Sequence, residues 1–174
     1  MRLAELNALP REAFVAALGA VFEHSPWVAA AVVDQRPFAS VAALHGAMCA
    51  AVAAAGDAPQ LALIRAHPQL AGKAAIAGDL TAHSRQEQRG AGLDQCSPDE
   101  FARIRALNDA YQQRFGFPFI VAVRGLGRTD ILAAMEQRLA LDAPTERAEA
   151  LRQIERIAAF RLADMLGEKG DGGI

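Results

Sequence analysis

Three side chains of this chain have the types and positions that acid–base chemistry and anion binding need: His67, Glu87 and Arg161. An imidazole exchanges protons near neutral pH, so His67 is a candidate general acid or base. Because the residue before a proline is biased away from helical geometry, Pro68 predicts that a helix ends here and holds the imidazole at its terminus. The alternative is a histidine that only interacts favourably with the carboxyl end of the helix dipole.

The glutamate stands in a second pattern, which also has a purely structural explanation. Ser84-Arg-Gln-Glu87 has the form of a capping box, in which the glutamate binds the backbone N–H of the serine that begins the helix. Arg85 and Gln88 add polar groups to the same turn, and the N-terminus of a helix is itself a site for anions. Glu87 is therefore either a catalytic carboxylate or a helix cap.

An arginine and an asparagine occupy apolar helix faces further along the chain. Arg161 interrupts a stripe of apolar residues at helical spacing, formed by Leu151, Ile154, Ile157, Ala158, Leu162 and Met165. A buried arginine needs an anion or several acceptors, which a ligand, an internal salt bridge or a place at the edge of the stripe would satisfy. Asn108 also lies on an apolar helix face, where backbone groups can satisfy a core amide.

The segment from Phe117 to Val123 departs from the helical pattern. It reads Phe-Pro-Phe-Ile-Val-Ala-Val, is rich in β-branched residues, and lies between Gly116 and Gly125. No partner strand is evident elsewhere in the sequence, so we expect an extended buried segment and no sheet. The backbone N–H and C=O groups of such a segment must be paired, and a ligand can supply those partners.

The remaining punctuation predicts an all-α fold, a single-domain multi-helix bundle over residues 1–168 followed by a polar tail at 169–174. Prolines and capping residues mark the helix starts. The predicted helices are Pro10–Phe22, a short helix that Ser25 and Pro26 cap and start and that carries Trp27, Ser40–Ala55, one from Asp57 to before Pro68, one from Ser84, Ser97–Phe115, Thr129–Leu141 and Pro144–Leu166.

Composition excludes several classes of function. The net charge is −2 and no basic block occurs, which argues against a nucleic-acid partner. No window reaches the ~18 uninterrupted apolar residues of a membrane helix, and the acidic start is unlike a signal peptide. Cys49 and Cys96 stand far apart and form no metal or redox motif, so we expect reduced thiols in a cytoplasmic protein.

Motifs spread over nearly the whole chain resemble one family, that of 2-oxo-4-hydroxy-4-carboxy-5-ureidoimidazoline (OHCU) decarboxylase. Each motif is short, and their order along the chain makes the resemblance specific. The motifs are Phe22-Glu-His-Ser-Pro-Trp27, Ala66-His-Pro-Gln-Leu-Ala-Gly-Lys73, Ser84-Arg-Gln-Glu-Gln88, Gly90-Ala-Gly-Leu-Asp94, Leu107-Asn108 with Tyr111, Phe115-Gly-Phe-Pro-Phe-Ile-Val-Ala-Val-Arg124, and Arg161.

The resemblance implies an all-α, cytoplasmic homodimer that uses neither cofactor nor metal and acts on a small-molecule ureide. The implied reaction is decarboxylation of OHCU to (S)-allantoin and CO₂ in urate degradation. It implies that His67 is the catalytic general acid or base and that Glu87 assists it. The implied substrate contacts are Pro68, Ser84, Gln88, Phe119, Ile120, Val121, Ala122, Val123 and Arg161. His83 departs from the pattern, because an acidic or small residue is expected there.

Two other functions compete with this hypothesis. A metal-dependent hydrolase of a ureide would use His83, Glu87 and His67 as ligands. Against it, a cap at Ser84 would put His83 outside the helix, and the sequence has no HExxH-type pair. A non-catalytic helical binding module would expose Arg161 and His67 on separate faces.

Overall fold

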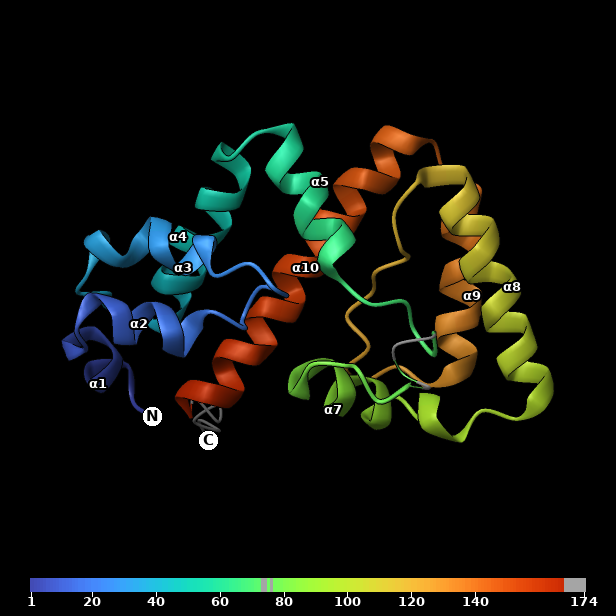
Figure 1. Ribbon diagram of the computed structural model, residues 1–174, viewed down its shortest axis with the longest axis horizontal. Coiled ribbons are helices and arrows are strands. Elements are labelled where there is room, and N and C mark those ends of the chain that lie inside the picture. The colour runs from blue at the N-terminus through green and yellow to red at the C-terminus, as the bar shows by residue number, and fades with distance from the viewer. Residues whose placement is uncertain (73–74, 76, 168–174) are drawn as a thin grey trace, which may run out of the picture. The chain divides into compact units, whose positions relative to one another are not determined.

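The computed structural model describes residues 1–72, 75 and 77–167. Every regular element in these ranges is a helix and none is a strand, which confirms the predicted all-α fold class (Figure 1). The predicted polar tail at 169–174 lies outside the described residues.

Contacts between Cα atoms divide the chain into two compact units. Unit 1 is Met1–Ala66 with Glu155–Ile174, and unit 2 is His67–Ile154. The single domain over 1–168 stays a prediction.

Unit 1 begins with a helix that the sequence did not predict. Its helices are α1 (Leu3–Ala8), α2 (Arg11–Leu18), α3 (Trp27–Val32), η1 (Val33–Gln35), α4 (Val41–Ala54), α5 (Asp57–Ala66) and the second half of α10 (Ala143–Leu166). Ser40 caps α4 as predicted, because its hydroxyl accepts the Ala43 N–H at 3.0 Å. The predicted cap at Ser25 is wrong, because its hydroxyl donates to the carbonyl of Glu23 and α3 follows Pro26.

The apolar stripe predicted on α10 is largely buried. Ile154, Ile157, Ala158 and Leu162 are buried, and Leu151 and Met165 are half-buried. Arg161 is 2% exposed within this stripe, so the guanidinium has left water. Burial of a charged group is costly without a partner, which makes the surroundings of Arg161 decisive for its role.

Unit 2 contains the elements that carry most of the predicted site. They are α7 (Ala82–Gly90), η2 (Leu93–Gln95), α8 (Pro98–Phe115), α9 (Arg128–Leu139) and the first half of α10. The capping box at the start of α8 is confirmed. Ser97 Oγ accepts the Glu100 N–H, and Glu100 Oε1 accepts the Ser97 N–H, both at 3.1 Å. Gly116, with φ of 74°, ends α8 in the left-handed conformation that glycine adopts without strain.

The predicted start of α7 at Ser84 is wrong. The N-cap is Thr81, whose hydroxyl accepts the Ser84 N–H at 3.2 Å, so the helix begins at Ala82. A second hydroxyl three residues upstream of Ser84 therefore supplies the cap. Glu87 consequently lies beyond the first turn, where it is not the capping partner of Ser84.

The chain between α8 and α9 crosses unit 2 without regular structure. Residues 118–123 form neither helix nor strand, and Figure 1 shows this stretch running back along the two helices to reach the start of α9. Phe119, Ile120, Ala122 and Val123 are buried and Val121 is half-buried. The prediction of a buried, non-helical segment is confirmed.

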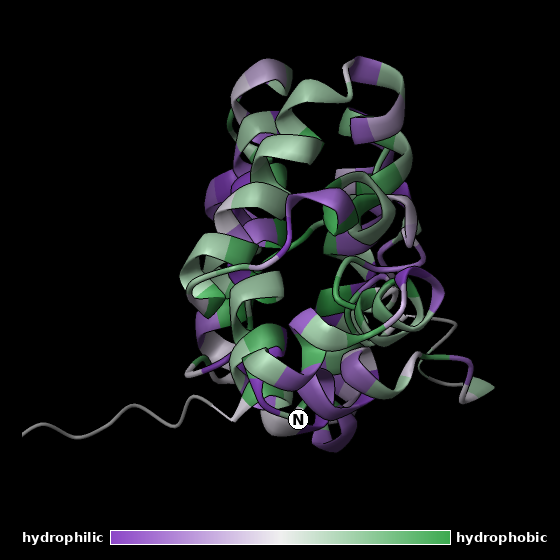
Figure 2. Ribbon diagram, turned by 90° about the vertical axis from the view of Figure 1, so that its left-hand side faces the viewer, coloured by the Kyte–Doolittle hydropathy of each residue, from purple (hydrophilic) through white to green (hydrophobic). Residues whose placement is uncertain are grey.

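Hydrophobic and hydrophilic residues are interspersed along the helices on the face shown in Figure 2. Such mixing is typical of helices that bury one side and expose the other. In the described ranges, no single helix is both long and apolar enough to cross a membrane. Helices α4 and α5 together have the necessary length and apolar composition, but the chain bends by 118° between them.

Ser97 gives a direct test of how the start of α8 is held. Ser97→Ala removes the acceptor for the Glu100 N–H and should lower the free energy of unfolding by about 1 kcal/mol. Ser97→Asp keeps an acceptor at the cap and should change stability by less than about 0.5 kcal/mol. Urea unfolding of the three proteins measures the difference, and equal midpoints would contradict the cap.

Candidate functional site

His67 lies directly after the last residue of α5, as the sequence predicted. The helix ends at Ala66, and Pro68 prevents its continuation. The imidazole is 7% exposed, so it is a buried titratable group at the start of a non-helical segment. This segment, His67–Ala71, turns at Ala71, which has a φ of 49°. A left-handed alanine costs about 1–2 kcal/mol, and such strain persists where neighbouring contacts fix the backbone.

Two buried side chains supply those contacts. Gln88 of α7 accepts the Ala71 N–H at 3.0 Å through Oε1, and its amide nitrogen donates to the Gln69 carbonyl at 3.4 Å. Asn108 of α8 donates to the Leu70 carbonyl at 2.9 Å. The backbone beyond His67 is therefore fixed from two helices. Asn108 is a core amide bound to backbone, as the structural alternative expects, while its Oδ1 has no partner among the described residues.

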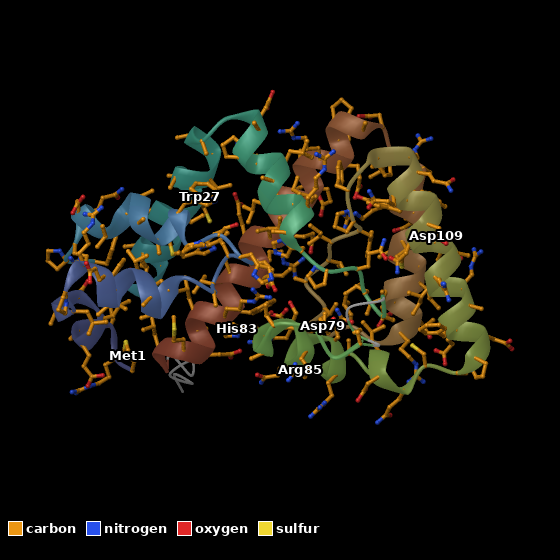
Figure 3. All side chains as sticks on the ribbon, in the orientation of Figure 1. Met1, Trp27, Asp79, His83, Arg85 and Asp109 are labelled. Atoms are coloured by element: carbon orange, nitrogen blue, oxygen red, sulfur yellow. The ribbon has the colours of Figure 1, made fainter. Side chains whose placement is uncertain are left out.

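Helix α7 carries the other predicted residues of this region. Ser84 and Gln88 are buried and Glu87 is half-buried. His83 and Arg85 project from the same helix (Figure 3). Because α7 begins at Ala82, His83 lies inside it, contrary to the sequence argument that placed His83 outside. Arg85 binds the carbonyls of Gly78 and Leu80, both at 3.1 Å, and so fixes the approach to the helix.

The buried segment Phe119–Val123 is held by side chains from α9 and α10. Arg138 Nη1 donates to the Ile120 carbonyl, and Gln153 Oε1 accepts the Ala122 N–H at 3.0 Å. The Arg138 guanidinium also lies over the Phe119 ring, 4.5 Å from its centroid. Protein side chains thus bind two of the backbone groups that a ligand was expected to bind, the Ile120 carbonyl and the Ala122 N–H.

One face of α8 connects the two non-helical segments. Asn108 and Tyr111 are three residues apart and share this face. Asn108 binds the Leu70 carbonyl, and the Tyr111 ring packs edge-on against Phe119 at 5.6 Å between centroids. The segment after His67 and the segment Phe119–Val123 are therefore both anchored on α8.

Tyr111 also reaches a buried carboxylate. Its hydroxyl donates to Glu146 Oε1, and burial together with this carboxylate raises the pKa of Tyr111 well above its usual value. The phenol therefore stays protonated over the whole physiological range and acts as a hydrogen-bond donor.

Arg161, in unit 1, forms a buried ion pair. Its Nη1 donates to Glu23 Oε2 at 2.8 Å and to the carbonyls of Ala20 and Val21 at 3.2 and 3.4 Å. Glu23 is 1% exposed. This is the internal salt bridge that the sequence left open as an alternative. Substrate binding by Arg161 stays a prediction.

Strained backbone accompanies two of the family motifs. In the described residues the non-glycine positions with positive φ are His24, at 47°, and Ala71, at 49°. His24 follows Glu23 in the motif that ends at Trp27, and its Nε2 lies 4.0 Å from Glu23 Oε1. At both positions the surrounding contacts must hold the strained backbone in place.

A cavity of about 410 Å³ lies beside α7 in unit 2. Its lining includes Arg85, Gln88, Arg89, Leu93, Cys96 and Phe101. Of the predicted site residues, only Gln88 contributes to it, and His67, Glu87 and Phe119–Val123 are absent from its lining. This cavity is therefore not the pocket that the predicted residues would form.

Neither metal binding nor thiol chemistry finds a basis in the described part of the chain. No three His, Cys, Asp or Glu side chains there are grouped to hold a metal ion, so the hydrolase hypothesis lacks a ligand set in those residues. Burial raises the pKa of the Cys49 thiol to about 11, helped by Glu155, and burial likewise raises that of Cys96. Both cysteines therefore remain thiols at neutral pH.

Sequence reasoning missed four buried polar residues that hold the site. Glu23, Arg138, Glu146 and Gln153 are 1%, 9%, 0% and 8% exposed. Arg138 lies in the last turn of α9 and Glu146 in the first turn of α10, where the helix dipole favours those charges. For Gln153 the sequence offered one indication of burial, because the residue lies next to Ile154 of the apolar stripe.

Comparison with known proteins gives a consistent result. A sequence model of the OHCU decarboxylase family matches residues 7–163. The 2-oxo-4-hydroxy-4-carboxy-5-ureidoimidazoline decarboxylase of Haloferax volcanii is 41% identical over 164 residues, which cover 94% of this chain and 95% of that protein. A crystal structure of (S)-allantoin synthase has a TM-score of 0.78 and 29% identity, covering 95% of this chain and 54% of that one.

Other relatives are much longer. The uric acid degradation bifunctional protein PucL of Bacillus subtilis is 42% identical over 167 residues, which are 96% of this chain. This chain spans 33% of PucL and 33% of a second Bacillus bifunctional protein, about a third of each.

The role of Gln88 in fixing the strained turn can be measured without substrate. Gln88→Met keeps the volume but leaves the buried Ala71 N–H without its acceptor, so we expect a loss of about 1–3 kcal/mol in the free energy of unfolding. Hydrogen exchange at the Ala71 amide should accelerate. Arg89→Met, on the exposed side of the same helix, is the matched control and should stay within about 0.5 kcal/mol of the parent. Equal stability of both variants would contradict this role.

Proposed function

Because this chain belongs to the OHCU decarboxylase family, we propose that it converts OHCU to (S)-allantoin and CO₂ in urate degradation. The observation that carries the proposal is the family match over residues 7–163, together with a buried histidine, His67, inside the matched range. The buried, anchored surroundings of this imidazole suit a proton carrier that must act at one face of a ring.

The substrate's own structure explains why this site needs few groups. Its carboxylate is attached to a ring carbon that also carries a hydroxyl and neighbours a C=N bond. When the C–C bond to the carboxylate breaks, CO₂ leaves and the electron pair moves into the C=N system. The nitrogen of that system takes up one proton, a second proton adds to the neighbouring carbon, and the hydroxyl proton is lost as the ring carbonyl forms, so one proton in total is taken up per CO₂ released. The protein's task is to orient the ring and deliver the proton to one face.

We assign the proton transfer to His67 with Glu87 as its partner. His67 takes the hydroxyl proton, gives a proton to carbon, or does both in turn. Thr81 caps α7, so the capping explanation for Glu87 no longer competes with this role. A carboxylate beside the imidazole would stabilise its protonated form and orient the ring.

The proposed substrate contacts come from three places in the chain. Pro68, Ser84 and Gln88 would line one side of the ring, the backbone of Phe119–Val123 would contact the ureide, and Arg161 would bind a carbonyl oxygen. Glu23 supports the last assignment. An arginine balanced by a carboxylate at 2.8 Å attracts a second carboxylate less than an unpaired cation does, yet still donates to neutral oxygens. Tight binding of the departing carboxylate would stabilise the ground state and slow the reaction.

The resemblance carries two further proposals. We propose that the protein is a homodimer and that it works in the cytoplasm.

Turnover of fresh OHCU by purified protein tests the function directly. We expect circular dichroism to grow as (S)-allantoin forms, with release of one CO₂ per substrate, in protein treated with EDTA and without added cofactor. Spontaneous decay in buffer gives the background and a racemic product. Racemic product at the background rate, or activity that returns only when metal is added, would refute the proposal.

Replacement of His67 tests its assigned role. His67→Asn keeps a polar side chain of similar reach but cannot carry a proton near neutral pH, so kcat should fall by ~10²–10⁴-fold. The control is His24→Asn, because His24 is exposed and asparagine tolerates its left-handed backbone. The control should keep kcat within about twofold, since an exposed side chain off the reacting atoms contributes little. A normal kcat in a folded His67→Asn protein would exclude His67 as the proton carrier.

A further inference from the structure

A buried network of three polar side chains lies behind the segment Phe119–Val123. Arg138 comes from α9, Glu146 from α10 and Tyr111 from α8, and all three are buried. Arg138 Nε donates to Glu146 Oε1 at 2.8 Å, and Nη2 and the Tyr111 hydroxyl donate to the same oxygen. The carboxylate thus fixes the guanidinium from one side and ties three helices together.

The third nitrogen of the Arg138 guanidinium, Nη1, binds the segment Phe119–Val123. Arg138 Nη1 donates to the Ile120 carbonyl, while the guanidinium plane covers the Phe119 ring. Two residues further along, Gln153 Oε1 accepts the Ala122 N–H at 3.0 Å, and Gln153 is itself held by Glu149 at 2.7 Å. Side chains from α9 and α10 therefore bind the backbone of Ile120 and of Ala122.

These two bonds define which edge of the segment faces the helices. In an extended chain the N–H and C=O of one residue point to one edge, and those of the next residue point to the other. Ile120 and Ala122 use the same edge, toward Arg138 and Gln153. In the extended conformation that the sequence predicts for this segment, the N–H and C=O of Val121 point to the opposite edge. Val121 is also the half-buried residue of the segment, whereas its neighbours on both sides are buried.

Stability alone gives a weak reason for this network. A buried ion pair is often no more stabilising than apolar side chains of the same volume. Apolar replacements, however, could not donate to the Ile120 carbonyl. Lysine is a poor replacement for Arg138, because one ammonium nitrogen cannot reproduce a planar fork that binds Glu146 through two nitrogens and the Ile120 carbonyl through the third.

We propose that Arg138, held by Glu146 and Tyr111, is a positioning residue for substrate: it fixes the Ile120 carbonyl and so presents the N–H and C=O of Val121 to the ureide. A ureide has an N–H donor beside a C=O acceptor, which can exchange two hydrogen bonds with the N–H and C=O of one residue. This inference rests on the proposed function, because it takes OHCU or its ureide product as the ligand.

The test separates positioning from stability. Arg138→Met leaves the Glu146 carboxylate buried without its cation and should unfold at a lower temperature. The triple variant Tyr111→Phe, Arg138→Met, Glu146→Leu removes the whole polar network and should recover most of the lost melting temperature. Both lack the bond to the Ile120 carbonyl. Both should therefore show KM for OHCU, and Kd for (S)-allantoin by calorimetry, raised about tenfold with kcat within about twofold. Ser97→Ala, destabilised at a remote cap, should keep the parent KM.

The outcomes distinguish the two proposals. If the parent protein turns over OHCU and the triple variant keeps the parent KM, the positioning role is overturned while the proposed function stands. A KM that follows melting temperature across all variants, Ser97→Ala included, overturns it equally, because the network would then act through stability alone. If the parent protein neither turns over OHCU nor binds (S)-allantoin, the proposed function fails and the positioning role fails with it.

Discussion

A buried chain that forms neither helix nor strand must find a partner for each backbone N–H and C=O, and the segment Phe117–Val123 imposes this constraint on unit 2. The partners come from side chains that had to be buried with it. Arg138 binds the Ile120 carbonyl, Gln153 binds the Ala122 N–H, and the Tyr111 ring packs against Phe119. The charge on Arg138 then requires Glu146. The irregular segment thus accounts for three of the buried polar side chains of this unit, Arg138, Glu146 and Gln153.

Each unit buries an arginine as an ion pair with a glutamate. Arg161 pairs with Glu23 in unit 1, and Arg138 pairs with Glu146 in unit 2. Each pair is charge-neutral, which removes the largest cost of burying a guanidinium. In both cases the arginine also donates to main-chain carbonyls, of Ala20 and Val21 in one unit and of Ile120 in the other. A planar fork that serves an anion and carbonyls together is a property of arginine and not of lysine.

The sequence placed the caps of α4 and α8 correctly, whereas the caps predicted at Ser25 and Ser84 are wrong. Ser40 and Ser97 each stand alone before a helix and were placed correctly. Before α7, Thr81 and Ser84 compete, and the upstream hydroxyl forms the cap. Arg138 and Glu146 escaped notice for another reason. Each lies at a helix end where the helix dipole favours its charge. Such positions are typical of exposed charged residues, whereas these two side chains are buried.

The cap of α7 at Thr81 affects the proposed chemistry as well as the helix. With the cap moved upstream, the carboxylate of Glu87 is not needed for the helix start, and Gln88 is placed to bind the Ala71 N–H. That bond, with the one from Asn108 to the Leu70 carbonyl, offsets the strain of the left-handed Ala71. The backbone after His67 is then fixed by Pro68 at one end and by two helices at the other. A displacement of about 1 Å can cost on the order of 100-fold in rate, so the proton transfer proposed for His67 would benefit from a rigid turn.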